Sequence, residues 1–402
     1  MTFCITSPNK SVPFDHVPFD QIDVLVPSGH HWYMNIFVVI FTLLTTLMHI
    51  YLTWAVGRLV WVAGLTSQLI VWLCSLLLWL LFLAGVRAAF NPSGRLAVIL
   101  ERFAFDWLGI LFLSTSVLLF FDLLTGFGLW ARPWLDMIRT GAWVVALLLI
   151  GVAFVQGARA PEISHYPVRL PRLPAALNGT RIVMLSDLHL GSQFGARWFA
   201  TLVDRVQALQ PDLILLGGDI VEGHGPPDPA LQAVFARLQA PLGVYAVTGN
   251  HEHFGDTRAA ITMTEEVGVV WLHDEMRVIA PRLRLAGVDD LGIRRDMDSS
   301  LTRQIESVAL TADGGTVIML SHTPAHVEQA ADAGIVLMLS GHTHNGQIWP
   351  FNYLVKAFYH YITGRYDING MTLIVSRGAG LWGPRMRLWR RGDIVEVTLL
   401  AK

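Results

Sequence analysis

Five short polar clusters follow apolar runs of the sequence, and they contain residue types that bind metals. The clearest is the pair His342 and His344, directly after the apolar run 334–339. The other four also follow strand-like apolar runs: Asp187 with His189; Asp219 with Glu222; Asn250 with His251, Glu252 and His253; and His322. A single Asp after a strand is usually a turn or helix-capping residue. Five such clusters together predict a metal site at one edge of a sheet.

The donor types narrow the choice of metal. The clusters offer carboxylate, imidazole and amide oxygen but no thiolate, because the only cysteines are Cys4 and Cys74. This donor set suits Mn, Fe or Zn. Two ions held roughly 3.5–4 Å apart need a bridging carboxylate and can activate a water between them. The sequence therefore predicts two divalent ions, with Asp219 placed to bridge them.

The elements that must position these clusters alternate between strands and helices from residue 181 onward. Runs such as 181–187 and 213–219 are short and apolar and end in polar turns, as buried strands do, whereas 196–209 has the period of an amphipathic helix. Continuous apolar strands are typical of sheets that are covered on both faces. About ten such strands predict an α/β domain over 181–402, built as a two-sheet β-sandwich flanked by helices.

The clusters and their order resemble the signature of the calcineurin-like metallophosphoesterases. That signature reads Asp-x-His, Gly-Asp-x-x-acid, Gly-Asn-His-Glu, a lone His and Gly-His-x-His, and all five blocks occur in this order across 187–344. The run GHTHNGQ and the tail VSRGAGLWGPRMRL are most similar to the YkuE/YaeI-type branch and to the multi-span transmembrane metallophosphoesterases. The resemblance implies a β-sandwich enzyme that hydrolyses phosphomonoester, phosphodiester or pyrophosphate bonds with two metal ions.

The resemblance also implies a role for each matching residue. The first metal is assigned to Asp187, His189 and His344, the second to Asn250, His322 and His342, and the bridge to Asp219. His251 is implied to be the catalytic general acid or to stabilise a phosphate oxygen. Glu222 and Asn345 depart from the Asp and Gly that are common in the family. The role of Glu222 stays open, whereas Asn tolerates the left-handed backbone that the turn at 345 requires.

The first 160 residues form a different part of the chain. The sequence is 53% hydrophobic and only 15% charged, against about 25% charged in soluble proteins. Four runs reach the roughly 20 residues that cross a bilayer: 34–56, 65–86, 107–129 and 141–158. They form a predicted membrane domain over 34–158, preceded by an N-terminal segment 1–33 and followed by a proline-rich linker 159–180. The net charge of −2 gives no case for nucleic-acid binding.

Charges around the spans predict their orientation. With the N-terminus inside, the inner segments hold seven Lys and Arg residues, namely Lys10, Arg87, Arg95, Arg102, Arg159, Arg169 and Arg172, and the outer loops hold three, namely Arg58, Arg132 and Arg139. Lys and Arg favour the cytoplasmic side, so we expect a multi-pass protein of a bacterial inner membrane with a cytoplasmic catalytic domain. Inside the spans, His49 and Asp122 belong to a polar route or contact lipid head groups, or else they form helix–helix hydrogen bonds or lie nearer the interface than the span edges suggest.

The sequence indicates less about the substrate than about the fold and the metal site. The apolar, aromatic segment 348–366 is either a core helix or a lip that meets the bilayer or an acyl chain. The stretch 381–391 combines tryptophans and arginines as membrane interfaces do, and Arg385 and Arg387 are candidate phosphate contacts. We expect a membrane-anchored phosphoesterase for a phosphorylated lipid or lipid-linked nucleotide, such as a UDP-diacylglucosamine-type precursor. The alternatives are a tethered phosphodiesterase for soluble substrates, or a membrane sensor or partner-binding module with secondary hydrolysis.

Overall fold

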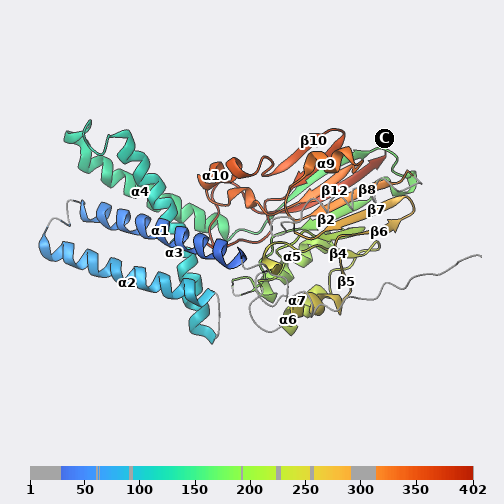
Figure 1. The fold of residues 1–402 in the computed structure, drawn as a ribbon, viewed down its shortest axis with the longest axis horizontal. Helices are drawn as coiled ribbons and strands as arrows, with labels where there is room; N and C mark the ends of the chain where they lie inside the picture. Colours follow the sequence, from blue (N-terminus) through green and yellow to red (C-terminus); the bar gives the residue numbers. More distant parts are fainter. Residues whose placement is uncertain are drawn as a thin grey trace, which may run out of the picture. The chain divides into compact units, whose positions relative to one another are not determined.

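Four long apolar helices make up the first part of the described chain (Figure 1). The computed structural model describes residues 29–59, 62, 64–89, 94–191, 193–222, 228–253, 258–290 and 314–401. The four helices are α1 (Gly29–Gly57), α2 (Leu65–Ala89), α3 (Gly94–Leu124) and α4 (Leu135–Gly157). Each contains a stretch that is long and apolar enough to cross a membrane. Most of the predicted N-terminal segment 1–33 lies outside the described residues.

Helix α3 starts earlier than the predicted span 107–129. Its first residues, 94–106, include the charged residues Arg95, Glu101, Arg102 and Asp106. This stretch is therefore not part of the apolar run, although charged residues are compatible with a helix. Polar groups deeper in the helices find partners. His49 Nε2 lies 2.9 Å from the carbonyl oxygen of Ser75, and the Tyr51 hydroxyl donates to Asp122 Oδ2 at 2.6 Å. His49 and Asp122 therefore form hydrogen bonds between helices, which is one of the predicted alternatives.

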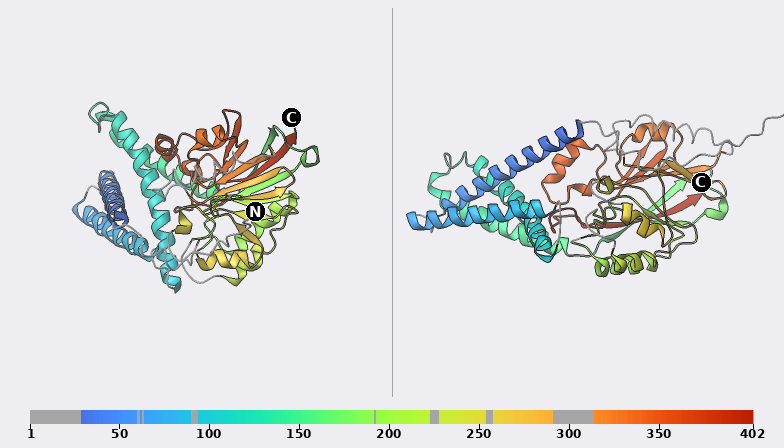
Figure 2. Two further views of the ribbon diagram at one scale, coloured as in Figure 1. Left: turned by 45° about the vertical axis from the view of Figure 1, so that its right-hand side comes forward. Right: turned by 60° about the horizontal axis from the view of Figure 1, so that its bottom comes forward.

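The second part of the chain contains two mixed, six-stranded sheets flanked by helices, which confirms the predicted fold class (Figures 1 and 2). The first sheet has the order β1 (Glu162–Leu170), β12 (Asp393–Ala401), β2 (Arg181–Leu185), β3 (Leu213–Leu216), β4 (Val244–Ala246) and β5 (Val269–Trp271). The second has the order β10 (Gly364–Ile368), β11 (Met371–Val375), β9 (Leu337–Ser340), β8 (Thr316–Ser321), β7 (Leu283–Val288) and β6 (Glu275–Ala280). The helices are α5 (Ala196–Ala208), α6 (Pro229–Phe235), α7 (Arg258–Glu265), α9 (Val327–Asp332) and α10 (Phe351–Phe358).

The inner strands, such as β2, β3, β9 and β11, are mostly apolar and buried because both faces of each sheet are covered there. In β2, Ile182 and Met184 pack between the two sheets, whereas Val183 and Leu185 pack against α5 and α6. On the second sheet, Met319 of β8 packs against α9 on the outer face. Successive residues of a strand point to opposite faces, so an uninterrupted apolar run fills two cores at once. The clusters that follow these strands are thereby fixed to rigid, buried elements.

The segment predicted to be a linker is largely a strand. Within 159–180, β1 pairs in parallel with β12 over nine residues, from Glu162 opposite Asp393 to Leu170 opposite Ala401. Four prolines and the lack of a sustained period predict a linker there. However, β1 is an edge strand, so the nitrogen of Pro167, which has no hydrogen to donate, can face away from the sheet. The folded domain therefore begins almost directly after α4.

Candidate metal centre

The ends of five parallel strands bring the predicted clusters together. Asp187 follows β2, Asp219 follows β3 and Asn250 follows β4, all in the first sheet. His322 follows β8, and the pair at 342 and 344 follows β9, both in the second sheet. Parallel strands end at the same edge of a sheet, and here the two sheets present these edges to each other. Two buried groups have ligand atoms within 4.8 Å of one another, namely Asp187 with His189 and His344, and Asp187 with Asp219 and His322.

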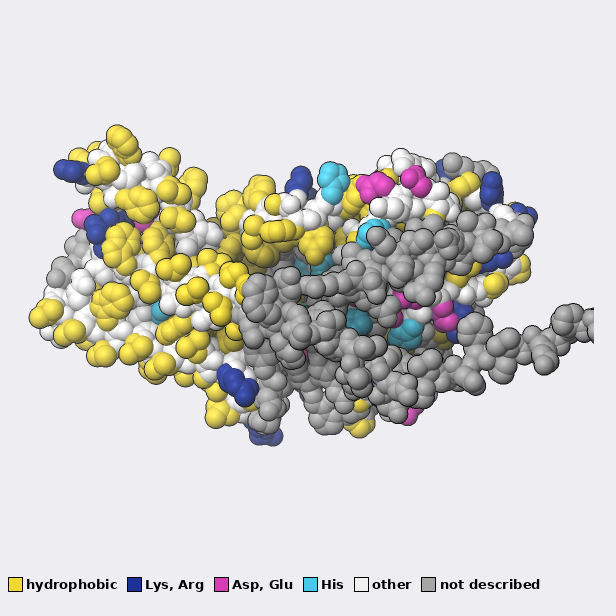
Figure 3. All heavy atoms as spheres, viewed as in Figure 1, with side chains coloured by type: hydrophobic (Ala, Val, Ile, Leu, Met, Phe, Trp, Pro, Cys, Tyr) yellow, Lys and Arg dark blue, Asp and Glu magenta, His cyan; other side chains and the backbone are white. Residues whose placement is uncertain are grey.

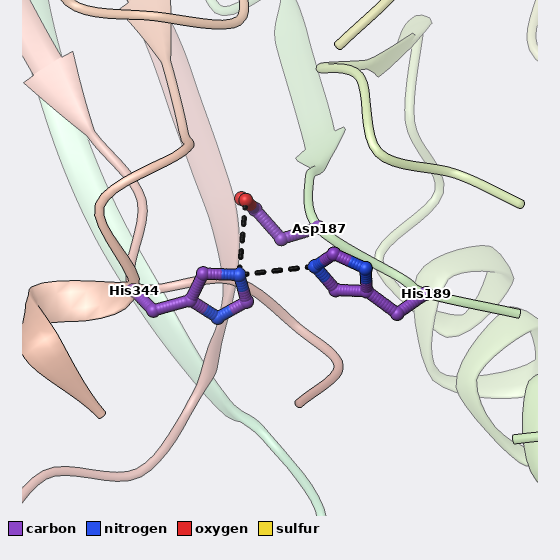
Figure 4. A group of neighbouring side chains, drawn as sticks. All are labelled: Asp187, His189 and His344. Atoms are coloured by element: carbon purple, nitrogen blue, oxygen red, sulfur yellow. Dashed lines mark hydrogen bonds and ion pairs between the residues drawn. The ribbon is translucent and has the colours of Figure 1, made fainter. Parts of the chain in front are cut away.

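The first group consists of Asp187, His189 and His344 (Figure 4). His344 Nε2 lies 3.3 Å from Asp187 Oδ1 and 3.1 Å from His189 Nε2. Burial lowers the pKa of His344, which favours the neutral imidazole that a metal requires. Burial acts to raise the pKa of Asp187, but His344 outweighs it and keeps the carboxylate ionised. Two imidazole nitrogens and a carboxylate that converge in a buried site suit a divalent cation.

The second group lies beside the first. His342 Nδ1 is 2.9 Å from Asn250 Oδ1 and 3.3 Å from His322 Nε2. His322 Nε2 in turn is 3.3 Å from Asp219 Oδ2, which is also 3.8 Å from His189 Nε2 of the first group. Asp187, Asp219 and His322 form a further set with converging donors. Both carboxylates therefore reach both groups, so Asp187 as well as Asp219 is placed to bridge two ions.

Glu222, whose role the sequence left open, connects a candidate ligand to the candidate acid. Its Oε1 lies 2.6 Å from His189 Nδ1, and its Oε2 lies 3.0 Å from His251 Nδ1. A carboxylate on the outer nitrogen of a metal-binding histidine fixes the orientation of the ring. Burial acts to lower the pKa of His251, but the hydrogen bond and charge of Glu222 raise it to about 9. Glu222 thus keeps His251 protonated at neutral pH.

The backbone at the site is left-handed at several candidate ligands. Positive φ angles of 47–69° occur at Asp187, His189, Asp219, His342 and His344. Such conformations cost about 1–3 kcal/mol each for residues other than glycine and persist only where the surroundings enforce them. One enforcing group is the buried carboxylate of Glu252, which accepts the backbone N–H groups of Asp219, Ile220 and Gly249 at 2.7–2.8 Å. Spacing along the sequence gave no sign of this role for Glu252.

Two further contacts differ from what the sequence indicated. The Tyr359 hydroxyl lies 2.7 Å from His342 Nε2, and nothing in the sequence singled it out. Arg387 is buried, and its guanidinium donates to the carbonyl oxygens of Arg377, Gly378 and Gly380 at 2.8–3.1 Å, so backbone acceptors occupy it and its contact with phosphate stays a prediction. Arg385 forms an ion pair with Asp106 of α3 at 2.5 Å rather than standing over the metal groups.

Replacing Glu222 with glutamine should shift the pH dependence of turnover. The charge on Glu222 helps to raise the pKa of His251, so activity that needs a protonated His251 falls as the pH rises through that pKa. Glutamine removes the charge, which lowers the pKa and moves this alkaline limb toward lower pH. Profiles of kcat against pH at saturating metal concentration test this, with Glu328→Gln, at an exposed pair with Tyr361, as the control. An unmoved limb would contradict the role of His251.

The comparisons with known proteins agree with this geometry. A family model described as calcineurin-like phosphoesterase matches residues 180–346. A transmembrane protein with a metallophosphoesterase domain from Danio rerio is 30% identical over 64% of this chain and 62% of its own length. A metallophosphoesterase of Helicobacter pylori is 30% identical over 66% of this chain and 71% of its own length.

YkuE, a metallophosphoesterase of Bacillus subtilis, is 27% identical over 59% of this chain and 85% of its own length. The chain thus spans less than two thirds of the zebrafish relative and more of the bacterial ones. The matched region of the family model contains every residue of the two metal groups. The chain belongs to the calcineurin-like metallophosphoesterase family and carries four apolar helices before the family domain.

Proposed function

We propose that the protein is a membrane-anchored phosphoesterase that uses two divalent metal ions, Mn, Fe or Zn. The observation that carries this proposal is the pair of adjacent buried donor groups that share the carboxylates of Asp187 and Asp219. In this assignment Asp187, His189 and His344 hold one ion, and Asn250, His322 and His342 hold the other. When bound, the two ions supply positive charge to a phosphoryl group and activate a water as nucleophile.

The residues of the chain then have distinct tasks. Glu222 holds His251 by Nδ1 at 3.0 Å, so the ring presents Nε2 as the atom that gives a proton to the departing oxygen of the substrate. Asp219 Oδ1 accepts the backbone N–H of His251 at 2.8 Å, which ties the position of this acid to the bridging carboxylate. The acid and the metal ligands thus form one rigid unit, as efficient catalysis requires.

A lipid or lipid-linked phosphoester is the substrate class that we favour. Membrane-type helices pack directly onto the loops of the family domain: Leu113 of α3 and Ala153 of α4 share a buried cluster with Ile348, Met386 and Leu388. Ile348 lies four residues after His344, so the centre is held close to these helices. A tethered phosphodiesterase for soluble substrates is the alternative, and a full-length protein that cleaves soluble and lipid phosphoesters equally well would favour it.

Removal of the metals gives a direct test of the activity. The full-length protein in detergent should contain close to two ions per chain and should hydrolyse bis-p-nitrophenyl phosphate. Chelation should abolish turnover, and Mn or Zn should restore it, because the bound ions would supply the positive charge for the phosphoryl group and the activated water. A membrane sensor without hydrolase function would instead show no turnover at any metal loading. A screen of phospholipids and lipid-linked nucleotides then identifies the substrate.

We also propose that the family domain faces the cytoplasm. The support is the seven-to-three excess of Lys and Arg on that side of the four spans. A C-terminal reporter that is active only outside the cytoplasm should therefore stay silent. Strong reporter activity would place the domain on the opposite side.

A further inference from the structure

Helix α10 exposes an apolar stripe next to the metal centre. None of its residues is buried, and Leu354 and Phe358 remain 51% and 78% exposed. Phe351, Leu354 and Phe358 recur at helical spacing and form one face, whereas Asn352 and Lys356 lie on the opposite face. Figure 3 shows hydrophobic side chains gathered over this helix. The alternative that this segment is a core helix is therefore wrong, since a core helix buries its apolar face.

Both ends of α10 are attached to the loop that carries the two candidate histidine ligands. At its start the backbone of Asn352 lies so close to Gly346, two residues after His344, that a Cβ there would collide with it. Just past its end, the Tyr359 hydroxyl lies 2.7 Å from His342 Nε2. Thr343, between the two histidines, donates to the carbonyl oxygen of Ile362 at 2.7 Å. A displacement of α10 would therefore move groups that hold the metal loop in place.

The exposed stripe continues a surface that belongs to the membrane helices. The ring of Phe351 packs edge-on against Phe112 of α3 at 5.7 Å between centroids, and α3 is one of the four candidate spans. Trp349, two residues earlier, packs on the cluster that contains Leu113 and Ala153. A short amphipathic helix that begins against the side of a membrane span is suited to lie in the interface with its apolar face against lipid.

We propose that α10 lies in the membrane interface with its apolar stripe in lipid, and that this contact positions Tyr359 against His342. The second half of the proposal rests on the proposed function. His342 directs Nδ1 toward Asn250 and His322; with a metal ion held at Nδ1, Nε2 would carry the proton and donate it to the Tyr359 oxygen. Outer partners of this kind contribute about 10–100-fold to metal affinity or activity. The bilayer thereby supports the metal site as well as anchoring the chain.

Spin labelling tests the location of α10 without any need for hydrolysis. Phe358→Cys and Val278→Cys are prepared separately in full-length protein that carries Cys4→Ser and Cys74→Ser, labelled with a nitroxide and placed in phosphatidylcholine–phosphatidylglycerol vesicles. Val278 is a matched control, because it is an apolar side chain of β6 that is 68% exposed. The label at 358 should collide more with oxygen than with a water-soluble nickel chelate, and the label at 278 should show the reverse. If the nickel chelate reaches both labels equally, the proposal is overturned. A surface that binds a protein partner would give this result.

Activity measurements test the coupling to the metal site. In the same vesicles, Phe358→Ser and Tyr359→Phe should each weaken activation by Mn by about 10–100-fold, and excess Mn should restore the rate. Val278→Ser should behave as the wild type does. Wild-type metal dependence in both variants overturns the coupling even if the label at 358 lies in lipid. Absence of turnover in the wild type would instead contradict the phosphoesterase assignment while leaving the labelling result intact.

Discussion

The Asp219→Asn variant is expected to hydrolyse phosphoesters at least about 100-fold more slowly than the wild type. Loss of a residue that only contacts a metal ligand costs about 10–100-fold, and loss of a residue that binds both metals should cost more. Asp219 Oδ2 lies 3.3 Å from His322 Nε2 and 3.8 Å from His189 Nε2, so its charge serves both metal groups. Burial acts to raise the pKa of Asp219, but His322, His251 and His189 together hold it well below its usual value. The carboxylate is therefore present as an anion, and asparagine cannot replace that charge.

The same variant should remain folded. Asparagine has the shape of aspartate and keeps an oxygen for the backbone N–H of His251. Hydrolysis of bis-p-nitrophenyl phosphate, bound metal per chain and the unfolding temperature are measured together. The control is Asp367→Asn on β10, whose exposed side chain pairs with Arg365 far from the metal groups. A wild-type rate in Asp219→Asn with both metals bound would falsify the proposed centre.

Arg387→Met should destabilise the family domain by about 3–5 kcal/mol. The side chain is only 2% exposed, and its guanidinium satisfies carbonyl oxygens of three residues in the segment 377–380. Methionine fills similar space but donates to none of these acceptors, although the Gly378 oxygen keeps the backbone N–H of Asp393 at 3.2 Å. Since Gly378 and Gly380 pack against His344 and the backbone of Asp187, the loss should also weaken metal binding.

Chemical denaturation of the full-length protein in detergent measures the loss in the free energy of unfolding caused by Arg387→Met. The bound metal per chain is measured in parallel. Arg390→Met provides the control, because Arg390 is exposed three residues further along the same segment. A substrate-binding role for Arg387 would have predicted the opposite pattern, with normal stability and a raised KM. Equal stability of the two variants would show that the carbonyl cluster contributes little.

The metal residues could be predicted from the sequence because their information is local. Each candidate ligand comes within a few residues of the end of a buried strand, and strands with two covered faces are apolar throughout, so both signals are visible in one short window. Asn345 illustrates the same point, since its φ of 53° is the left-handed geometry that an Asn at this turn was expected to tolerate. The two-sheet fold follows from the same pattern.

Features that depend on packing between distant segments could not be predicted in this way. The burial of Arg387 arises because the tail folds back over the loop after β11, and arginine in a segment rich in tryptophan looked like an interface residue. Glu222 and Tyr359 meet their histidine partners across 33 and 17 residues of sequence. The exposure of α10 depends on what lies beside it, which its own amphipathic pattern does not specify.

The pairing of β1 with β12 has a consequence for how the protein is made. β1 follows α4 directly, yet its only neighbour in the sheet is the last strand of the described chain. Until that strand leaves the ribosome, β1 has no partner in the sheet and cannot join β2, since β12 pairs with both of them. Contacts between such distant segments form late in folding. We therefore expect the four helices to enter the membrane before the first sheet is complete, with membrane insertion as the earlier step and completion of this sheet as the later one.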